Sequence, residues 1–145
     1  NADESLDDIT SCLKWLRETP QCNGLVSTVG FGIGSNLSYL CGLWLDIEST
    51  VCYDFHGSSF FKNNDTYIRR PMLIHLSADI YKEIIKDKKN QYIEKMQNIN
   101  LNVYDNCKRN FFRISDKSYN EAIASEANKL TLTHIKNSFA KPHST

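Results

Sequence analysis

A thiol and two imidazoles are the side chains in this 145-residue chain with the most evident capacity for chemistry. Cys52 and His56 lie four positions apart, and His75 follows further along the chain. Such a set could provide a nucleophile and its general base. No third group that would orient the base is recognisable, and neither is an oxyanion loop. A small cysteine hydrolase is therefore one hypothesis, resting on these three residues alone, and no catalytic residue is assigned.

Two groups of charged residues allow both a functional and a structural interpretation. Asp46 and Asp54 could form a pair of carboxylates, but they stand among apolar residues, and we interpret them as surface or capping groups. The basic run of Lys86, Lys88 and Lys89 could meet a phosphate. We interpret it as the solvated face of a helix.

The segment Gly30–Gly34 reads GFGIG and invites comparison with a phosphate-binding loop. Such a loop needs a preceding strand and a following helix within a βαβ unit. We do not recognise that context in the sequence. The glycines of Gln21–Gly34 instead indicate turns or a close approach of two backbone segments. No cofactor is predicted.

The cysteines do not form a pattern typical of a metal site or a disulfide framework. Cys41, Cys52, His56 and His75 lack the closely spaced ligand pairs of structural zinc sites, so no metal is predicted. An odd, widely spaced set favours reduced and mostly buried thiols in an intracellular protein. The five cysteines are Cys12, Cys22, Cys41, Cys52 and Cys107.

Charge and hydropathy exclude some classes of protein. Seventeen basic residues balance seventeen acidic ones, which argues against a free-standing DNA-binding domain. No apolar run is long enough to span a bilayer, so no membrane contact is predicted. The length suits one domain, or one domain with a small additional module.

The first half of the chain changes character near residue 35. Ser5–Glu18 has an apolar stripe at helical spacing, and Gln21–Gly34 contains the alternation of a strand. Ser35–Glu48 fits both a strand and a helix, and its periodicity does not decide between them. Ser49–Asp65 shows little pattern and is expected to be loop.

The clearest helix signal lies in the segment Arg70–Ile114. Ser77 is a plausible N-cap, and the residues Ile80–Ile85 that follow place their apolar members on one helical face. Ile84 lies at the centre of that stripe. The apolar residues of Asn102–Ile114 are spaced by three and four positions, which predicts a second helix.

The last predicted helix, Ser118–Phe139, carries two apolar faces instead of one. A helix packed only on its own domain needs a single apolar stripe. One interpretation is that half of this helix packs on the home core while Ile135 and Phe139 meet another chain. The alternative is a break near Lys129–Thr131 that turns both halves toward one core.

Taken in order, several short segments resemble the third partner-of-Sld-five subunit of the GINS complex. The resemblance covers most of the chain, but an expected proline before the Leu-Trp-Leu segment is missing, and Lys88–Asn100 looks like an insertion. The matching segments are SLDDI near the start, Pro20-Gln21-Cys22, Val29-Gly30-Phe31, Leu37-Ser38, Leu43-Trp44-Leu45, Arg69–Ile84, Asn102-Val103-Tyr104-Asp105, Lys108, Phe111-Phe112 and Leu130–Phe139.

This resemblance implies a mainly helical α+β fold, in which a small N-terminal β-containing module (1–36) precedes a helical bundle module (37–145). It also resolves Ser35–Glu48 toward helix. The implied function is that of a nuclear, non-catalytic scaffold in a heterotetrameric DNA-replication complex. The implied partners are the other GINS subunits and the MCM helicase ring with its associated activator, with DNA touched at most indirectly. The expected partner-contacting residues are Leu132, Ile135, Phe139, Trp44, Phe111 and Phe112.

A rival interpretation is a secreted or surface α+β binding protein with disulfides and N-glycans. It rests on the odd cysteine count and on two glycosylation triplets, Asn36-Leu37-Ser38 and Asn64-Asp65-Thr66. Free thiols would favour the nuclear scaffold, whereas disulfides and attached glycan would favour the secreted protein.

Overall fold

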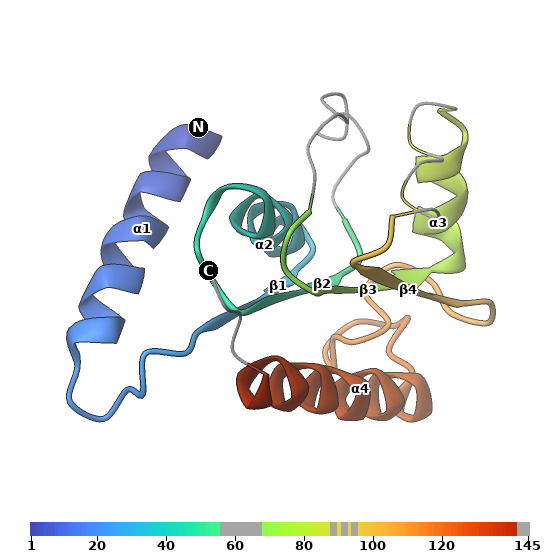
Figure 1. Ribbon diagram of the computed structural model, residues 1–145. Coiled ribbons are helices and arrows are strands. Elements are labelled where there is room, and N and C mark those ends of the chain that lie inside the picture. Colours follow the sequence, from blue (N-terminus) through green and yellow to red (C-terminus); the bar gives the residue numbers. More distant parts are fainter. Residues whose placement is uncertain (56–67, 88–89, 91–92, 94–95, 142–145) are drawn as a thin grey trace.

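The computed structural model describes residues 1–55, 68–87, 90, 93 and 96–141, and within them it contains one four-stranded parallel sheet (Figure 1). The strands follow one another across the sheet in sequence order, β1-β2-β3-β4. In chain order the elements are α1 (Ala2–Glu18), β1 (Ser27–Phe31), α2 (Ile33–Trp44), β2 (Ser49–Tyr53), β3 (Met72–Ser77), α3 (Ala78–Ile85), β4 (Ile99–Tyr104) and α4 (Glu121–Ala140).

Helices cover both faces of the sheet, and each face has its own hydrophobic core. In Figure 1, α2 and α3 lie on one face and α4 lies on the other. Cys52, Ile74 and Leu76 belong to the core under α2 and α3, while Tyr53 and Leu73 belong to the core under α4. Successive strand residues point to opposite faces, so both central strands, β2 and β3, are buried at every position.

The expected fold class, a small β-containing module followed by a helical bundle, is wrong. Strands alternate with helices along the chain, and β1 pairs in parallel with β2 from Ser27↔Ser49 to Phe31↔Tyr53. The expected boundary between residues 36 and 37 falls inside α2. A division of the chain at that point stays a prediction for limited proteolysis.

Some of the helices expected from the sequence are present, and other segments have a different secondary structure from the one expected. The helix expected from Ser5 begins at Ala2, and Ser35–Glu48 is largely helical, as α2. Ser77 does precede a helix, although its hydroxyl makes no capping hydrogen bond there. The segment beginning at Ser49, expected as loop, forms β2, and the start of the helix expected over Asn102–Ile114 is instead the end of β4.

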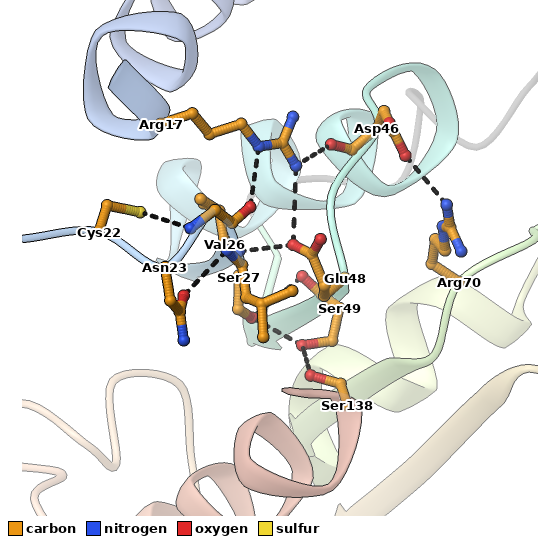
Figure 2. Close-up of polar contacts among 12 residues, drawn as sticks. Arg17, Cys22, Asn23, Val26, Ser27, Asp46, Glu48, Ser49, Arg70 and Ser138 are labelled. Atoms are coloured by element: carbon orange, nitrogen blue, oxygen red, sulfur yellow. Dashed lines mark hydrogen bonds and ion pairs between the residues drawn. The ribbon is translucent and has the colours of Figure 1, made fainter. Parts of the chain in front are cut away.

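A polar network ties α1 and α2 to the amino end of the sheet (Figure 2). Arg17 on α1 donates to the carbonyl oxygens of Gly24 and Asp46 at 3.2 and 2.6 Å, and it lies 3.7 Å from the Glu48 carboxylate. Glu48 in turn accepts a hydrogen bond from the backbone of Val26. This network attaches the end of α1 to the sheet, and none of the described side chains of that helix is fully buried.

Serine hydroxyls extend the network across the sheet to α4. Ser138 donates to the Ser49 hydroxyl at 2.8 Å, and Ser49 donates to the Ser27 hydroxyl at 2.8 Å (Figure 2). Because these hydroxyls are partnered, they can be buried at little cost.

No described helix is both long enough and apolar enough to cross a membrane.

The passage from β1 into α2 is unusually tight, because only Gly32 separates the two elements. A Cβ placed on Gly30 would overlap the backbone carbonyl of Gly34. The absence of a side chain at Gly30 is therefore what lets the first turn of α2 lie against the end of β1.

We predict that Gly30→Ala destabilises the fold by about 3 kcal/mol, the upper range for a rigid overpacked site. Gly34→Ala is the matched control, since a Cβ there meets nothing within 4 Å. It should change stability by less than about 1 kcal/mol. Urea denaturation of both variants measures the difference, and equal midpoints would contradict the close approach.

Candidate functional site

The carboxyl ends of the four parallel strands meet at one edge of the sheet, where α/β proteins bind their ligands. Three residues with positive φ lie in the segments that leave this edge: Gly32 after β1, Asp54 after β2 and Asn110 in the loop after β4. For Asp54 and Asn110, which carry side chains, this conformation is sparsely populated. Such strain persists where the surroundings enforce it, and it gathers at functional sites. This edge is therefore the candidate site.

Gly32 occupies a sharp strand-to-helix turn with φ 59° and ψ −119°. Its N–H donates to the carbonyl of Tyr53 at 3.0 Å, which holds the turn beside the end of β2. Glycines stand two positions before and two positions after it. This is the spacing and setting of the nucleophile elbow, G-x-S-x-G, with glycine in place of the nucleophile.

Ser35, three residues after Gly32, locks this turn but does not supply a nucleophile. Its hydroxyl is fully buried and donates toward the carbonyls of Gly30 and Tyr53 at 2.7 and 2.8 Å. The same oxygen accepts from the Tyr53 N–H at 2.7 Å. A hydroxyl that is hydrogen-bonded to three backbone groups stabilises the turn.

Asp54 brings a buried carboxylate to the same edge. Its Oδ1 accepts from the Ser77 backbone N–H at 2.7 Å and from the Ser77 hydroxyl at 3.1 Å. Its Oδ2 is buried and makes no hydrogen bond within the described part of the chain. The side chain is only 1% exposed, so one carboxylate oxygen is held away from bulk water with unused accepting capacity.

Burial raises the pKa of Asp54 from 3.8 to about 6. The hydrogen bonds from Ser77, the positive charge of Arg109 and the N–H of Asn110 oppose that rise, because each favours the ionised form. The result is a carboxyl group that changes protonation close to neutral pH. Such a value suits a general acid or base.

Arg109 and Cys107 come from the loop that follows β4. Arg109 reaches α3, where its guanidinium lies 3.3 Å from the carboxylate of Glu83, and both side chains remain about half exposed. Cys107 is buried, and its sulfur donates to the carbonyl of Tyr104 at 3.4 Å. Burial, with the nearby charges of Asp54 and Asp79, raises the pKa of the Cys107 thiol to about 11, so it stays a thiol.

The cysteine and histidines singled out in the sequence do not form a catalytic pair. Cys52 faces α2, and its pKa is raised strongly by burial. His75 faces α4 on the opposite side of the sheet, where it bonds to Thr131. His56 lies outside the described residues. The thiol and the imidazole are thus separated by the sheet itself.

His75 belongs to a buried polar network that attaches α4 to the sheet. Its Nδ1 lies 2.9 Å from the Tyr104 hydroxyl and its Nε2 lies 3.0 Å from the Thr131 hydroxyl. Tyr53 joins the network through Thr131, at 2.6 Å between the two hydroxyl oxygens. Burial and the neighbouring His134 lower the pKa of His75 to about 4. The imidazole is therefore neutral at pH 7 and structural.

The charged groups considered in the sequence, the pair of carboxylates and the run of lysines, do not form a site either. Asp46 is at the amino end of the sheet, paired with Arg70 at 3.0 Å, and so does not pair with Asp54 at the carboxyl end. Lys86 is exposed at the end of α3, whereas Lys88 and Lys89 lie outside the described residues. Among the residues that are described, no three His, Cys, Asp or Glu side chains gather as metal ligands.

The six expected partner-contacting residues have different surroundings. Phe111 is fully buried in the core under α4, and Phe112 and Ile135 pack half-buried against the same core. Phe139 is half-buried, while Trp44 and Leu132 are 63% and 58% exposed. Their contact with another chain stays a prediction.

Sequence reasoning missed Gly32 and Asp54 as members of one site. In the sequence, the GFGIG segment was compared only with phosphate-binding loops. The signal that could have identified the turn at Gly32 was the elbow pattern, in which a strand is followed by a central residue between two glycines and then by a helix. Asp54 directly follows a strand, β2, that was not predicted. Without that strand, its place at the carboxyl edge could not be inferred.

Comparison with known proteins gives the fold a name. No family model matches the chain, and no curated protein matches it. A dienelactone hydrolase structure from Klebsiella pneumoniae subsp. pneumoniae superposes with a TM-score of 0.72 at 15% identity, covering 93% of this chain and 61% of that one. An esterase from Pyrococcus furiosus superposes with a TM-score of 0.58 at 13% identity, covering 88% of this chain and 61% of that one. The fold is an α/β hydrolase fold, and the chain spans about three fifths of each neighbour.

These neighbours correct the prediction of a GINS subunit. The prediction of a non-catalytic scaffold of a DNA-replication complex is wrong, because the parallel sheet with helices on both faces superposes on the structures of a dienelactone hydrolase and an esterase and is not the fold expected of a GINS subunit. The expectation that the chain is not an enzyme falls for the same reason. The nuclear location and the GINS and MCM partners rested on that resemblance and remain without a test. The rival disulfide-bonded protein also loses its basis in the cysteines, since all five are free thiols.

We predict that the ionised Asp54 side chain costs stability at neutral pH. The folded pKa of about 6 exceeds the ordinary 3.8, so the cost is absent below about pH 3.8 and complete above about pH 6. Relative to Asp54→Asn, which mimics the neutral form, the wild type should lose about 3 kcal/mol between about pH 3.5 and pH 7. Chemical denaturation of both proteins across this range measures it. If the stability difference between the two proteins did not change with pH, the pKa of Asp54 would not be raised in the folded protein.

Proposed function

We propose that the chain forms the sheet of a hydrolase that cleaves a small ester or lactone, with Asp54 as general base. The observation that carries the proposal is the Asp54 Oδ2, which is buried and makes no hydrogen bond within the described residues, at the edge of the sheet where the strand-to-helix turn at Gly32 also lies. The two structural neighbours, named as a dienelactone hydrolase and an esterase, support the substrate class.

The turn at Gly32 decides which route the reaction takes. Glycine has no side chain that could be acylated, and Ser35 is committed to backbone groups. A covalent acyl intermediate at this turn is therefore not available. A Cβ at Gly32 would meet nothing within 4 Å, so the space that a nucleophile's side chain fills elsewhere is open here. A water molecule can take that place.

Hydrolysis then proceeds in two steps that balance. In the first, the ionised Asp54 accepts a proton from water as the water oxygen attacks the carbonyl carbon. In the second, the tetrahedral intermediate expels the alcohol oxygen, which receives the proton from Asp54. The products are a carboxylic acid and an alcohol, joined in one molecule when the substrate is a lactone, and Asp54 returns to its ionised form.

The developing negative charge on the carbonyl oxygen needs donors. The first N–H groups of an α-helix have no acceptor within the helix, and α2 begins at Ile33, directly after the turn. Backbone N–H groups in this position stabilise oxyanions in hydrolases with an elbow. Arg109 adds a positive charge, which also keeps Asp54 more ionised than burial alone would allow.

We predict that Asp54→Asn lowers the rate of p-nitrophenyl acetate hydrolysis by about 100-fold or more, the usual contribution of a general base. Asparagine keeps an oxygen to accept from Ser77, so the turn should survive the change. Asp46→Asn is the matched control, because Asp46 lies at the amino end of the sheet and its side chain is largely exposed. That variant should hydrolyse the ester at the wild-type rate.

Thermal denaturation establishes that all three proteins are folded before their rates are compared. Equal rates for the wild type and Asp54→Asn would remove Asp54 from the reaction. A wild-type rate no higher than that of buffer alone would remove the hydrolase proposal itself.

A further inference from the structure

We propose that the ester carries an uncharged apolar group, and that this group lies on the rings of Phe31 and Phe112 and in the hollow beside them. The inference rests on the proposed function, because it assigns a place to one part of that substrate. The residues it names select the substrate and take no part in the proton transfer.

Two aromatic rings at the carboxyl edge of the sheet remain open to solvent. Phe31 ends β1 and is 48% exposed, and Phe112, in the loop after β4, is half-buried. The centroids of these two rings lie 5.2 Å apart. Both rings also pack on Tyr53, with centroid distances of 4.6 Å for Phe31 and 5.8 Å for Phe112. The packing on Tyr53 holds the two rings together as one apolar surface.

Each ring is close along the chain to a member of the candidate site. Phe31 directly precedes Gly32, at the turn that has the setting of a nucleophile elbow. Phe112 follows two residues after Asn110, whose backbone N–H favours the ionised form of Asp54. A substrate whose carbonyl carbon lies at the turn can therefore extend over the two rings.

A hollow of about 340 Å³ opens beside Phe112, where the loop after β4 meets the amino-terminal part of α4. Figure 1 shows this loop, coloured orange, running from β4 to the start of α4. The volume lies at the lower end of the range for sites that bind small molecules. The apolar lining residues are Phe112, Ile114, Tyr119, Ala124 and Leu132. Because Ile114 and Leu132 are 81% and 58% exposed, the hollow presents apolar surface that an occupant would remove from water.

Tyr53 joins the ring pair to the hollow. Its ring packs on Phe31 and Phe112, and its hydroxyl donates to Asn128 Oδ1 at 2.8 Å. Asn128 belongs to α4 and lines the hollow. Since Tyr53 is only 1% exposed, it is a fixed support for both parts. The rings and the hollow thus form one continuous binding surface.

The charges around the hollow favour an uncharged occupant. Its charged lining residues, Glu121 and Lys129, have opposite signs, and both are exposed on α4. They give the lining no net charge that would attract an ion. An ionised group that leaves water needs a partner of opposite charge, whereas an apolar group gains free energy from the surface it buries. A hydrocarbon chain fits this surface better than a carboxylate.

The test compares four esters, with hydrolysis followed by proton release. Methyl acetate is the reference, methyl hexanoate and hexyl acetate place a longer chain on either side of the carbonyl, and monomethyl adipate ends its chain in a carboxylate. We expect kcat/KM to rise about 30-fold from methyl acetate to at least one uncharged longer ester, as if roughly half of the added methylene groups left water. Monomethyl adipate should be hydrolysed no faster than methyl acetate.

A matched pair of variants on α4 locates the effect. Leu132→Asn should reduce the ratio of kcat/KM between the favoured longer ester and methyl acetate by about fivefold or more, because it replaces an apolar lining residue with a polar one. Leu130→Asn is the control, since Leu130 lies on the same helix, is 39% exposed and lines a different groove. That variant should keep the wild-type ratio. The ratio is measured within one preparation, so a partly unfolded variant does not imitate the effect.

Titration with hexanamide, an uncharged compound that is not an ester, provides a measurement besides activity. We expect the backbone amide NMR signals of Ile114 and Leu132 to shift, and those of Trp15 and Trp44 to stay in place. The two tryptophans are 69% and 63% exposed, so they report unspecific binding to apolar surface.

The outcomes separate this inference from the proposed function. If p-nitrophenyl acetate is hydrolysed but neither uncharged longer ester exceeds methyl acetate, the inference is overturned and the proposed function stands. If no ester is hydrolysed faster than in buffer, the proposed function falls, and the hexanamide titration alone decides on the hollow. Shifts confined to the hollow would then uphold it as a site for an apolar group, and shifts that are absent or equally large at the two tryptophans would overturn it.

Discussion

The buried hydroxyl of Ser35 is the contact on which the candidate site depends. It joins the last residues of β1, the first turn of α2 and the end of β2 through hydrogen bonds to Gly30 and Tyr53. The close approach of Gly30 and Gly34 brings this hydroxyl within reach. Between these fixed points Gly32 has no freedom to relax, so its positive φ is imposed by the surrounding bonds.

The same contact sets the electrostatics of Asp54. Tyr53 is held by Ser35 and Gly32, so the next residue leaves β2 with its carboxylate turned toward Ser77 at the end of β3. There it is almost fully buried, and burial outweighs the hydrogen bonds and the Arg109 charge in raising its pKa. A turn that carries no nucleophile therefore shares an edge of the sheet with a carboxyl group whose pKa of about 6 lies close to neutral pH.

Sequence reasoning succeeded where one segment carries its own signal. The stripe of α1 and the start of α3 after Ser77 could be read locally, and Ser118–Phe139 was recognised as helical because its apolar residues repeat at helical spacing. It failed where the structure of a segment is determined by its neighbours in the sheet. Ser49–Tyr53 is buried on both faces and so shows no alternation, and its serine, threonine and cysteine do not look like a core strand. Asn102–Tyr104 was assigned to a helix because apolar residues further along happen to repeat every three or four positions.

The site could not be assembled from the sequence because its members are distant along the chain. Gly32, Asp54 and Arg109 come to the same edge only when β1, β2 and β4 lie in one parallel sheet, because the carboxyl ends of these strands then share that edge. The resemblance to a GINS subunit also matched short segments without testing whether they pair as strands. A sheet order is a property of long-range contacts, and short motifs do not contain it.

The central claim is that this turn supports ester hydrolysis without a covalent intermediate. The most direct measurement is the intact mass of the protein, quenched with acid during steady-state turnover of p-nitrophenyl acetate. The account predicts turnover above the rate in buffer with the protein mass unchanged. An acetyl adduct that forms in proportion to the enzyme and disappears as the substrate is exhausted would contradict it, because some side chain would then be acting as a nucleophile.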